Sequence, residues 1–255
     1  MTGILKVNQI EPTTGTTITL GASGDTIAIP SGATFTNSGT TSTITISGAL
    51  NVDGGTIKLD GNYPTGSRNI ALGDTALDSV ESGGTDNTVI GNRAATATTT
   101  GDRNTVYGSD AYRCNATASD NTAFGYQAMF CNTSGNNNIA IGNALCKNTS
   151  GLYNVAMGSG ALSSNTTASA NVGIGRLALT TNTTGANNVA IGCCALKSNT
   201  TASNNVAVGF ESLKSNTEGG SNAAVGTNAL TANTTGSSNN AFGSTALDNN
   251  TTGSS

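Results

Sequence analysis

A short phrase, N-x-[AV]-x-G, recurs in eleven copies along most of this chain at a nearly constant interval, with Gly173 in place of Ala or Val in one copy. The interval between successive glycines is 17 residues, apart from one of 18 and one of 16, where a residue is missing between Gly142 and Ala144. Such a period indicates a repeat architecture in which each copy is one unit stacked on the next. The repeats cover residues 69–255, and their glycines are Gly73, Gly91, Gly108, Gly125, Gly142, Gly158, Gly175, Gly192, Gly209, Gly226 and Gly243.

Two apolar columns recur within each copy. With the first Asn of the phrase as repeat position 0, position 3 is always a large apolar residue and position 8 is mostly Leu. A helix is disfavoured because every copy contains Gly, β-branched residues and Asn are frequent, and no apolar stripe recurs every 3.6 residues. One copy has too small a core to fold alone. We therefore predict an all-β parallel β-solenoid with one coil per 17 residues and with positions 3 and 8 forming its core.

Composition excludes several functions. Charged residues make up 9% of the chain, the net charge is −4 and there is no His. The ten basic residues are too few and too scattered to bind a nucleic-acid backbone, so no nucleic acid is expected as a partner. Without His, neither a Ser-His-Asp nor a Cys-His arrangement can form, and the acidic residues are scattered over loops. We expect no enzymatic activity, no cofactor and no metal.

The polar columns predict ladders rather than reactive sites. Position 11 is usually Asn, whose stacked amides can hydrogen-bond from coil to coil. Many of these Asn residues also form glycosylation sequons, but no secretory signal is visible, and we favour the ladder. The five cysteines form no C-x-x-C pair, and we expect them to be free thiols. Cys114 and Cys131, one period apart, are then neighbours in a thiol ladder within reach of a disulfide.

Repeat position 2 predicts self-association. It is never charged and nearly always small, although it lies on the strand face opposite to position 3. A strand that is apolar on both faces is buried on both. We therefore expect this column to face other copies of the chain in a homo-oligomer. The predicted interface consists of Ala71, Ala123, Ala140, Ala156, Ala190, Ala207, Ala224 and Ala241.

Two resemblances suggest what such an oligomer does. The segment NNVAIG (187–192) resembles the NSVAIG repeat in the heads of YadA-like trimeric autotransporter adhesins, a family that implies a β-roll and a homotrimer. The period here is longer than in that family. The fuller pattern N-x-A-x-G-x-x-A-L-x-x-N-T-T-G resembles repeats of bacteriophage tail-fibre proteins. These resemblances cover residues 69–255 and are specific for architecture but weak for function.

Residues 1–68 have a different sequence pattern from the 17-residue repeats. Short alternating strands at 16–21, 25–30, 42–47 and 55–60 predict a short-stranded β stalk over 16–68. The opening segment resembles the amino-terminal region of structural proteins of marine cyanophages. That resemblance implies a virion-anchoring segment at 1–15 that contacts other virion proteins. Its candidate docking residues are Ile4, Leu5, Val7 and Ile10, which could equally belong to an ordinary edge strand of the stalk.

These observations favour a structural fibre of a bacteriophage virion that contributes to host attachment. The chain would assemble in the host cytoplasm, since no signal peptide or membrane span is visible. A bacterial surface adhesin is the main alternative, and an ice-binding solenoid, suggested by repeated Thr pairs, ranks last. A receptor patch for a host glycan or protein could lie where charge is densest, although a solvated face is the simpler interpretation. The candidate patch contains Arg93, Asp102, Arg103, Asp110 and Arg113.

Overall fold

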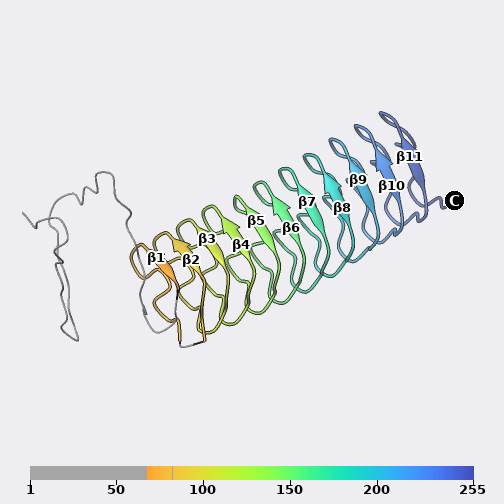
Figure 1. Cartoon of the computed structure of the whole chain (residues 1–255). Helices are drawn as coiled ribbons and strands as arrows, with labels where there is room; N and C mark the ends of the chain where they lie inside the picture. Colours follow the sequence, from red (N-terminus) through yellow and green to blue (C-terminus); the bar gives the residue numbers. More distant parts are fainter. Residues whose placement is uncertain (1–67, 82) are drawn as a thin grey trace, which may run out of the picture. The chain divides into compact units, whose positions relative to one another are not determined.

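The computed structural model describes residues 68–81 and 83–255, which form a stack of similar coils (Figure 1). The predicted virion-anchoring segment and nearly all of the predicted stalk lie outside these residues. The described part is all-β, contains no helix, and has eleven short parallel strands in one sheet, so the predicted β-solenoid is confirmed. The strands are β1 (Ile70–Leu72), β2 (Thr88–Ile90), β3 (Thr105–Tyr107), β4 (Thr122–Phe124), β5 (Ile139–Ile141), β6 (Val155–Met157), β7 (Val172–Ile174), β8 (Val189–Ile191), β9 (Val206–Val208), β10 (Ala223–Val225) and β11 (Asn240–Phe242).

Each strand pairs only with the strands of the coils before and after it. Corresponding repeat positions pair, so that Ala190 of β8 lies opposite Ala207 of β9 and Ile191 lies opposite Val208. The 17-residue period therefore becomes a column of identical or similar side chains along the stack. A three-residue strand is too short to be stable alone, and its stability depends on this repeated pairing.

The orientation of the strand was predicted wrongly. From Val89 onward the residues at position 2 are at most 2% exposed within a single chain, because they point into the coil. A Cβ added to Gly173, the one glycine at position 2, would lie 3.2 Å from Cγ of the core residue Leu162. The side chains predicted to form an interface, Ala123, Ala140, Ala156, Ala190, Ala207, Ala224 and Ala241, are thus core residues, and Ala71 is partly buried against the same core. Position 3, predicted to be inside, points outward.

The interior is narrow, which explains why position 2 is small. Position 7 contributes a second column of small residues, mostly Ala, and position 8 contributes the large ones. Leu162, Leu179, Leu196, Leu213 and Leu230 are fully buried, so the predicted core role of position 8 is confirmed. In every coil with Leu or Met at position 8, position 2 is Ala or Gly, and a buried Val occupies it only in the two coils with Ala95 or Tyr112 at position 8.

The leucines at position 8 have an unusual backbone conformation. Leu196 has φ 48°, a left-handed value that is rare for a bulky residue, and the same holds in every coil. Its amide nevertheless donates a 3.0 Å hydrogen bond to the carbonyl of Ser212 in the next coil. Burial of the side chain and this backbone bond together hold the residue in a conformation that would otherwise be strained.

Two buried Asn ladders connect the coils. At position 11, Nδ2 of Asn199 donates to Oδ1 of Asn182 (2.8 Å), which confirms the predicted ladder. At position 0, Oδ1 of Asn188 accepts hydrogen bonds from the backbone N–H (3.0 Å) of Asn205. This second ladder was not foreseen, because position 0 was used only to align the copies. Both columns are almost completely buried, and the sequon Asn residues in them, apart from the partly exposed Asn250, are inaccessible to glycosylation.

The recurring glycine at position 4 ends each strand at a sharp bend. Gly192 has φ 136°, and a Cβ there would collide with the carbonyl of Gly209 in the next coil. The coil with the missing residue closes by a tighter turn. There the amide of Ala144 donates to the carbonyl of Gly142 (2.9 Å), two residues back, whereas in most coils the corresponding bond spans three.

Candidate functional site

The outward face of the sheet is the most extensive surface feature. Strand residues at positions 1 and 3 alternate with the buried position 2 and therefore point away from the core. We call these two columns the apolar strip. Its most exposed members include Leu72 (47%), Phe124 (52%) and Phe242 (71%). Tyr107 and Phe124 stack along it, with ring centroids 4.9 Å apart and planes 11° apart.

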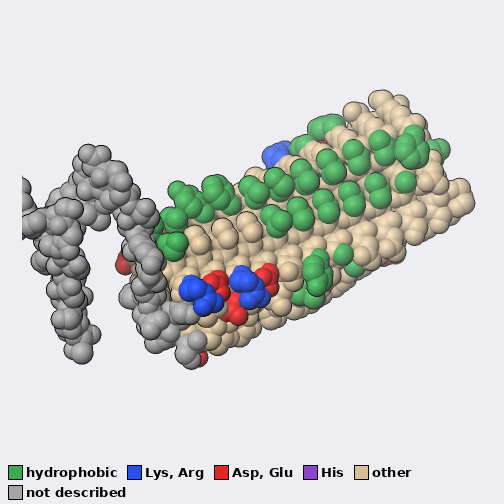
Figure 2. Space-filling view, viewed as in Figure 1, with side chains coloured by type: hydrophobic (Ala, Val, Ile, Leu, Met, Phe, Trp, Pro, Cys, Tyr) green, Lys and Arg blue, Asp and Glu red, His purple; other side chains and the backbone are tan. Residues whose placement is uncertain are grey.

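The apolar strip carries no charged residue on any of the eleven strands. Figure 2 shows hydrophobic side chains in rows that follow the strands along the described stack. Both columns consist mostly of Ile, Val, Thr or aromatic residues, which is typical of strands. The sequence analysis found these columns but assigned one of them to the interior. The signal it missed was that position 1 is also β-branched or apolar in nearly every copy. Positions 1 and 3 together therefore form the outward apolar face, and position 2 forms the inward one.

The predicted receptor patch is divided between two places. In one, a ladder of alternating charge follows the residue before position 0: Nε of Arg68 lies 2.5 Å from Asp86, and Nε of Arg103 lies 2.6 Å from Asp120. The hydrogen bond from each Arg lowers the pKa of its Asp below the usual range. Asp102 lies beside this charge ladder, and its Oδ1 accepts a 2.7 Å bond from the amide of Thr85.

The other part of the patch lies on the turn that contains positions 6 to 10. Here the nearly buried Asp110 accepts a 2.7 Å hydrogen bond from Arg93 through Oδ2. Its Oδ1 is buried without a hydrogen bond and lies 3.6 Å from Nη1 of Arg113. The guanidinium of Arg113 makes no hydrogen bond to the described residues, and its Cζ lies 5.8 Å from the ring centroid of Phe130, which is a cation–π distance.

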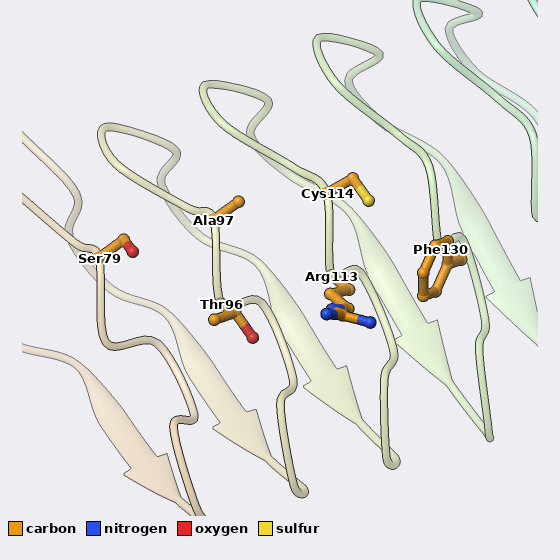
Figure 3. Close-up of a pocket in the computed structure, with 6 residues that line it drawn as sticks. All are labelled: Ser79, Thr96, Ala97, Arg113, Cys114 and Phe130. Atoms are coloured by element: carbon orange, nitrogen blue, oxygen red, sulfur yellow. The ribbon is translucent and has the colours of Figure 1, made fainter.

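Arg113 also lines a surface hollow of about 590 Å³ (Figure 3). Large side chains at Arg113 and Phe130 stand beside small ones on the preceding coils, and this step in size creates the hollow. Figure 3 shows Arg113 and Phe130 on neighbouring coils with Thr96 and Ser79 on the coils before them. The lining consists of Ser79, Thr96, Ala97, Arg113, Cys114 and Phe130.

All five cysteines are free thiols, as predicted. Burial raises the pKa of Cys114, Cys146 and Cys194, which keeps these thiols protonated and unreactive near neutral pH. Cys193 and Cys194 are neighbours in sequence, and their sulfur atoms are 3.5 Å apart. These features describe packed thiols rather than a reactive centre.

Some of the repeated threonine hydroxyl groups form hydrogen bonds between coils. Oγ1 of Thr166 donates to the carbonyl of Thr183, and Oγ1 of Thr183 donates to the carbonyl of Thr200, at 3.3 and 3.1 Å. A flat ice-binding face needs two outward columns of free threonine hydroxyls. Here one member of a Thr pair bonds to the next coil instead, except in the last pair, Thr251–Thr252.

Within residues 68–81 and 83–255, no group of three or more Cys, Asp or Glu side chains is placed to hold a metal ion. The same residues contain no helix long and apolar enough to cross a membrane. No family model matches the chain, and no match was found among curated proteins or solved structures. The fold and surface by themselves define the class: a repetitive β-solenoid with a continuous apolar strip.

Proposed function

We propose that this chain is a structural fibre of a bacteriophage virion, a tail fibre or a similar appendage that extends from the particle and contributes to host attachment. It acts as a homotrimer in which the apolar strips of the copies face one another. The observation that supports this proposal most directly is the strip itself, an uncharged surface that continues over eleven strands. The resemblance to phage fibre repeats supplies the virion context.

The dimensions of the strip suit self-association. Strands in a sheet are about 4.8 Å apart and rise about 3.3 Å per residue, so eleven three-residue strands make a strip about 50 Å long and about 10 Å wide. Two such strips pressed together bury on the order of 1,000 Å², the lower limit for a specific protein interface. In a second copy of the chain, equivalent side chains have the same spacing from coil to coil, so contacts between two strips stay in register over the whole length. A partner with another spacing would lose that register within a few coils.

The first experiment is the solution mass by light scattering. The chain has a mass of 25.1 kDa, and the proposal expects a species three times as heavy. Ile191→Lys with Val206→Lys places charge on the strip at positions that are already 39% and 38% exposed in one chain. This variant should remain folded by circular dichroism but become monomeric. The matched control, Thr184→Lys with Thr201→Lys, adds the same charge at exposed turn positions and should keep the wild-type mass.

Two results would contradict the proposal. A wild-type chain that stays monomeric at high micromolar concentration would overturn the assembly. The virion assignment is tested separately by mass spectrometry of purified particles of the phage that encodes the chain. Peptides from the repeats should be present in the particles. Their absence from particles, with detection on a bacterial surface instead, would favour the adhesin alternative.

A further inference from the structure

The hollow beside Arg113 is where the coils depart most from their own pattern. A stack of equivalent coils presents an equivalent surface along its length, so a local ligand site needs local departures. Several fall on the second to fourth coils: Ala95 and Tyr112 replace the usual Leu at position 8, Thr98 replaces Asn at position 11, and Arg113 and Phe130 occupy position 9. The later coils carry Ser, Thr or Lys at most copies of position 9, and the hollow lies beside the exceptional residues.

Arg113 retains unused hydrogen-bonding capacity there. A guanidinium has five N–H donors, and Arg103 spends two of its own on Asp120. Among charged groups of the described residues, the guanidinium of Arg113 has the 3.6 Å contact to Asp110, and it makes no hydrogen bond to these residues. Asp110 is already bound more closely by Arg93, at 2.7 Å. Two arginines share one carboxylate, so this cluster keeps one net positive charge at the wall of the hollow.

The remaining walls limit what can bind. The guanidinium lies over the ring of Phe130, and this cation–π contact favours the direction it has in the structure. Ala97 and Phe130 provide apolar surface, and Ser79 provides a hydroxyl group. Oγ1 of Thr96 already donates to the carbonyl of Arg93 (2.8 Å) and can still accept a hydrogen bond. The volume of about 590 Å³ lies within the range of about 300–1,000 Å³ that is typical of small-ligand sites. Asp78 shares the column of Arg113 two coils away but does not line the hollow.

We propose that this hollow binds a carboxylate-bearing sugar, such as a hexuronate unit of a surface polysaccharide. The sugar carboxylate pairs with Arg113, because a guanidinium matches the two oxygens of a carboxylate. The apolar face of the sugar ring packs on Ala97 and Phe130. Its hydroxyl groups bond to the hydroxyl of Ser79 and donate to Oγ1 of Thr96. Binding of the sugar does not depend on the proposed function as a fibre, but a role of this binding in host attachment rests on that proposed function.

Binding is tested by saturation-transfer difference NMR with sodium glucuronate as the probe and with glucose and acetate as comparison ligands. Glucuronate is expected to bind with a millimolar Kd, and glucose and acetate should bind more weakly. Arg113→Ala should weaken glucuronate binding about tenfold, as expected when a charge-assisted contact is lost. Phe130→Leu should weaken it less. The matched control is Lys197→Ala, which removes a positive charge from the same repeat position in another coil.

Each alternative outcome would overturn the proposal. Equal affinity for acetate and glucuronate would mean that the hollow binds any small anion. An equal loss in Lys197→Ala and Arg113→Ala would indicate unspecific attraction to positive charge. If glucuronate gave no saturation-transfer signal, the hollow would not be a binding site for it. Circular dichroism and light scattering of the same samples show whether each variant is folded and assembled, so failure of the sugar site is distinguishable from failure of the fibre proposal.

Discussion

Replacement of Asn199 by alanine measures how strongly the position-11 ladder holds neighbouring coils together. Asn199 is fully buried. Its Nδ2 donates to Oδ1 of Asn182 (2.8 Å) and to the carbonyl of Ala202 (3.0 Å), and its Oδ1 accepts from Nδ2 of Asn216 (3.1 Å). The substitution removes three hydrogen bonds and leaves partners on both adjacent coils.

The expected cost follows from the groups left behind. The Oδ1 of Asn182 and one N–H of Asn216 would remain in an interior without water. A buried polar group that loses its partner costs about 1–3 kcal/mol. The carbonyl of Ala202 still accepts from Asn188 and adds little. We therefore expect Asn199→Ala to lower the free energy of unfolding by about 2–6 kcal/mol, counting two such groups.

Asn250→Ala is the matched control. Asn250 donates the same pair of bonds, to Asn233 (3.0 Å) and Gly253 (3.1 Å), but it is partly exposed and its Oδ1 accepts no bond from the described residues. Water can replace what is lost, and the cost should be about 1 kcal/mol or less. Urea unfolding followed by circular dichroism compares the two variants. Because coils contact only their neighbours, Asn199→Ala should also broaden or split the transition. Equal costs for the two variants would refute the role assigned to the ladder.

Asn199→Asp adds a test through pH. A carboxylate cannot donate to Asn182, and its burial should raise its pKa in the folded state above the unfolded value. The destabilisation should therefore increase as the pH rises from the unfolded pKa through the folded one. At low pH the protonated group can donate again, and the variant should recover part of its stability. A cost independent of pH would mean that the side chain has escaped to solvent.

Two further predictions concern single residues. Tyr112→Phe should lower the free energy of unfolding, measured in urea, by about 1–2 kcal/mol, because the buried hydroxyl of Tyr112 donates to Oδ1 of Asn104 at 3.0 Å. Burial also raises the pKa of Tyr112, so the wild-type protein should lose stability as the pH rises above the ordinary tyrosine pKa. A stability that does not change with pH in that range would contradict this. Arg103→Ala should return the lowered pKa of Asp120 toward its ordinary value in a carboxyl-carbon NMR titration. The small stabilisation from the Arg103–Asp120 pair is present above the ordinary Asp pKa and is lost as the pH falls through the lowered one; an unchanged titration would show that the pair does not form in solution.

The candidate sites were only partly predictable. The charged residues from Arg93 to Arg113 were identified as a patch because they are close in sequence. A coil turns its residues in different directions, however. Arg103 therefore lies in the charge ladder with Asp102 beside it, while Arg93, Asp110 and Arg113 lie near the hollow. The hollow also needs Ser79 and Phe130 from other coils. Its existence depends on the side-chain sizes at equivalent positions of neighbouring coils. The period shows which positions are equivalent, but the sizes must be compared between copies to find the hollow.

The sequence by itself determined the period, the strand, the stacking and the Asn ladder at position 11, because each of these repeats at a constant interval and so needs only counting. It did not determine which face of the strand is inside. Alternation divides the strand into two faces, and both were apolar, with Ala190 on one and Ile191 on the other. Only the closure of the coil decided between them. In the coils where a leucine such as Leu196 fills the narrow interior, position 2 is Ala or Gly, and a larger Val is buried there only beside Ala95 or Tyr112. The bulky face was therefore left outside, where it forms the apolar strip.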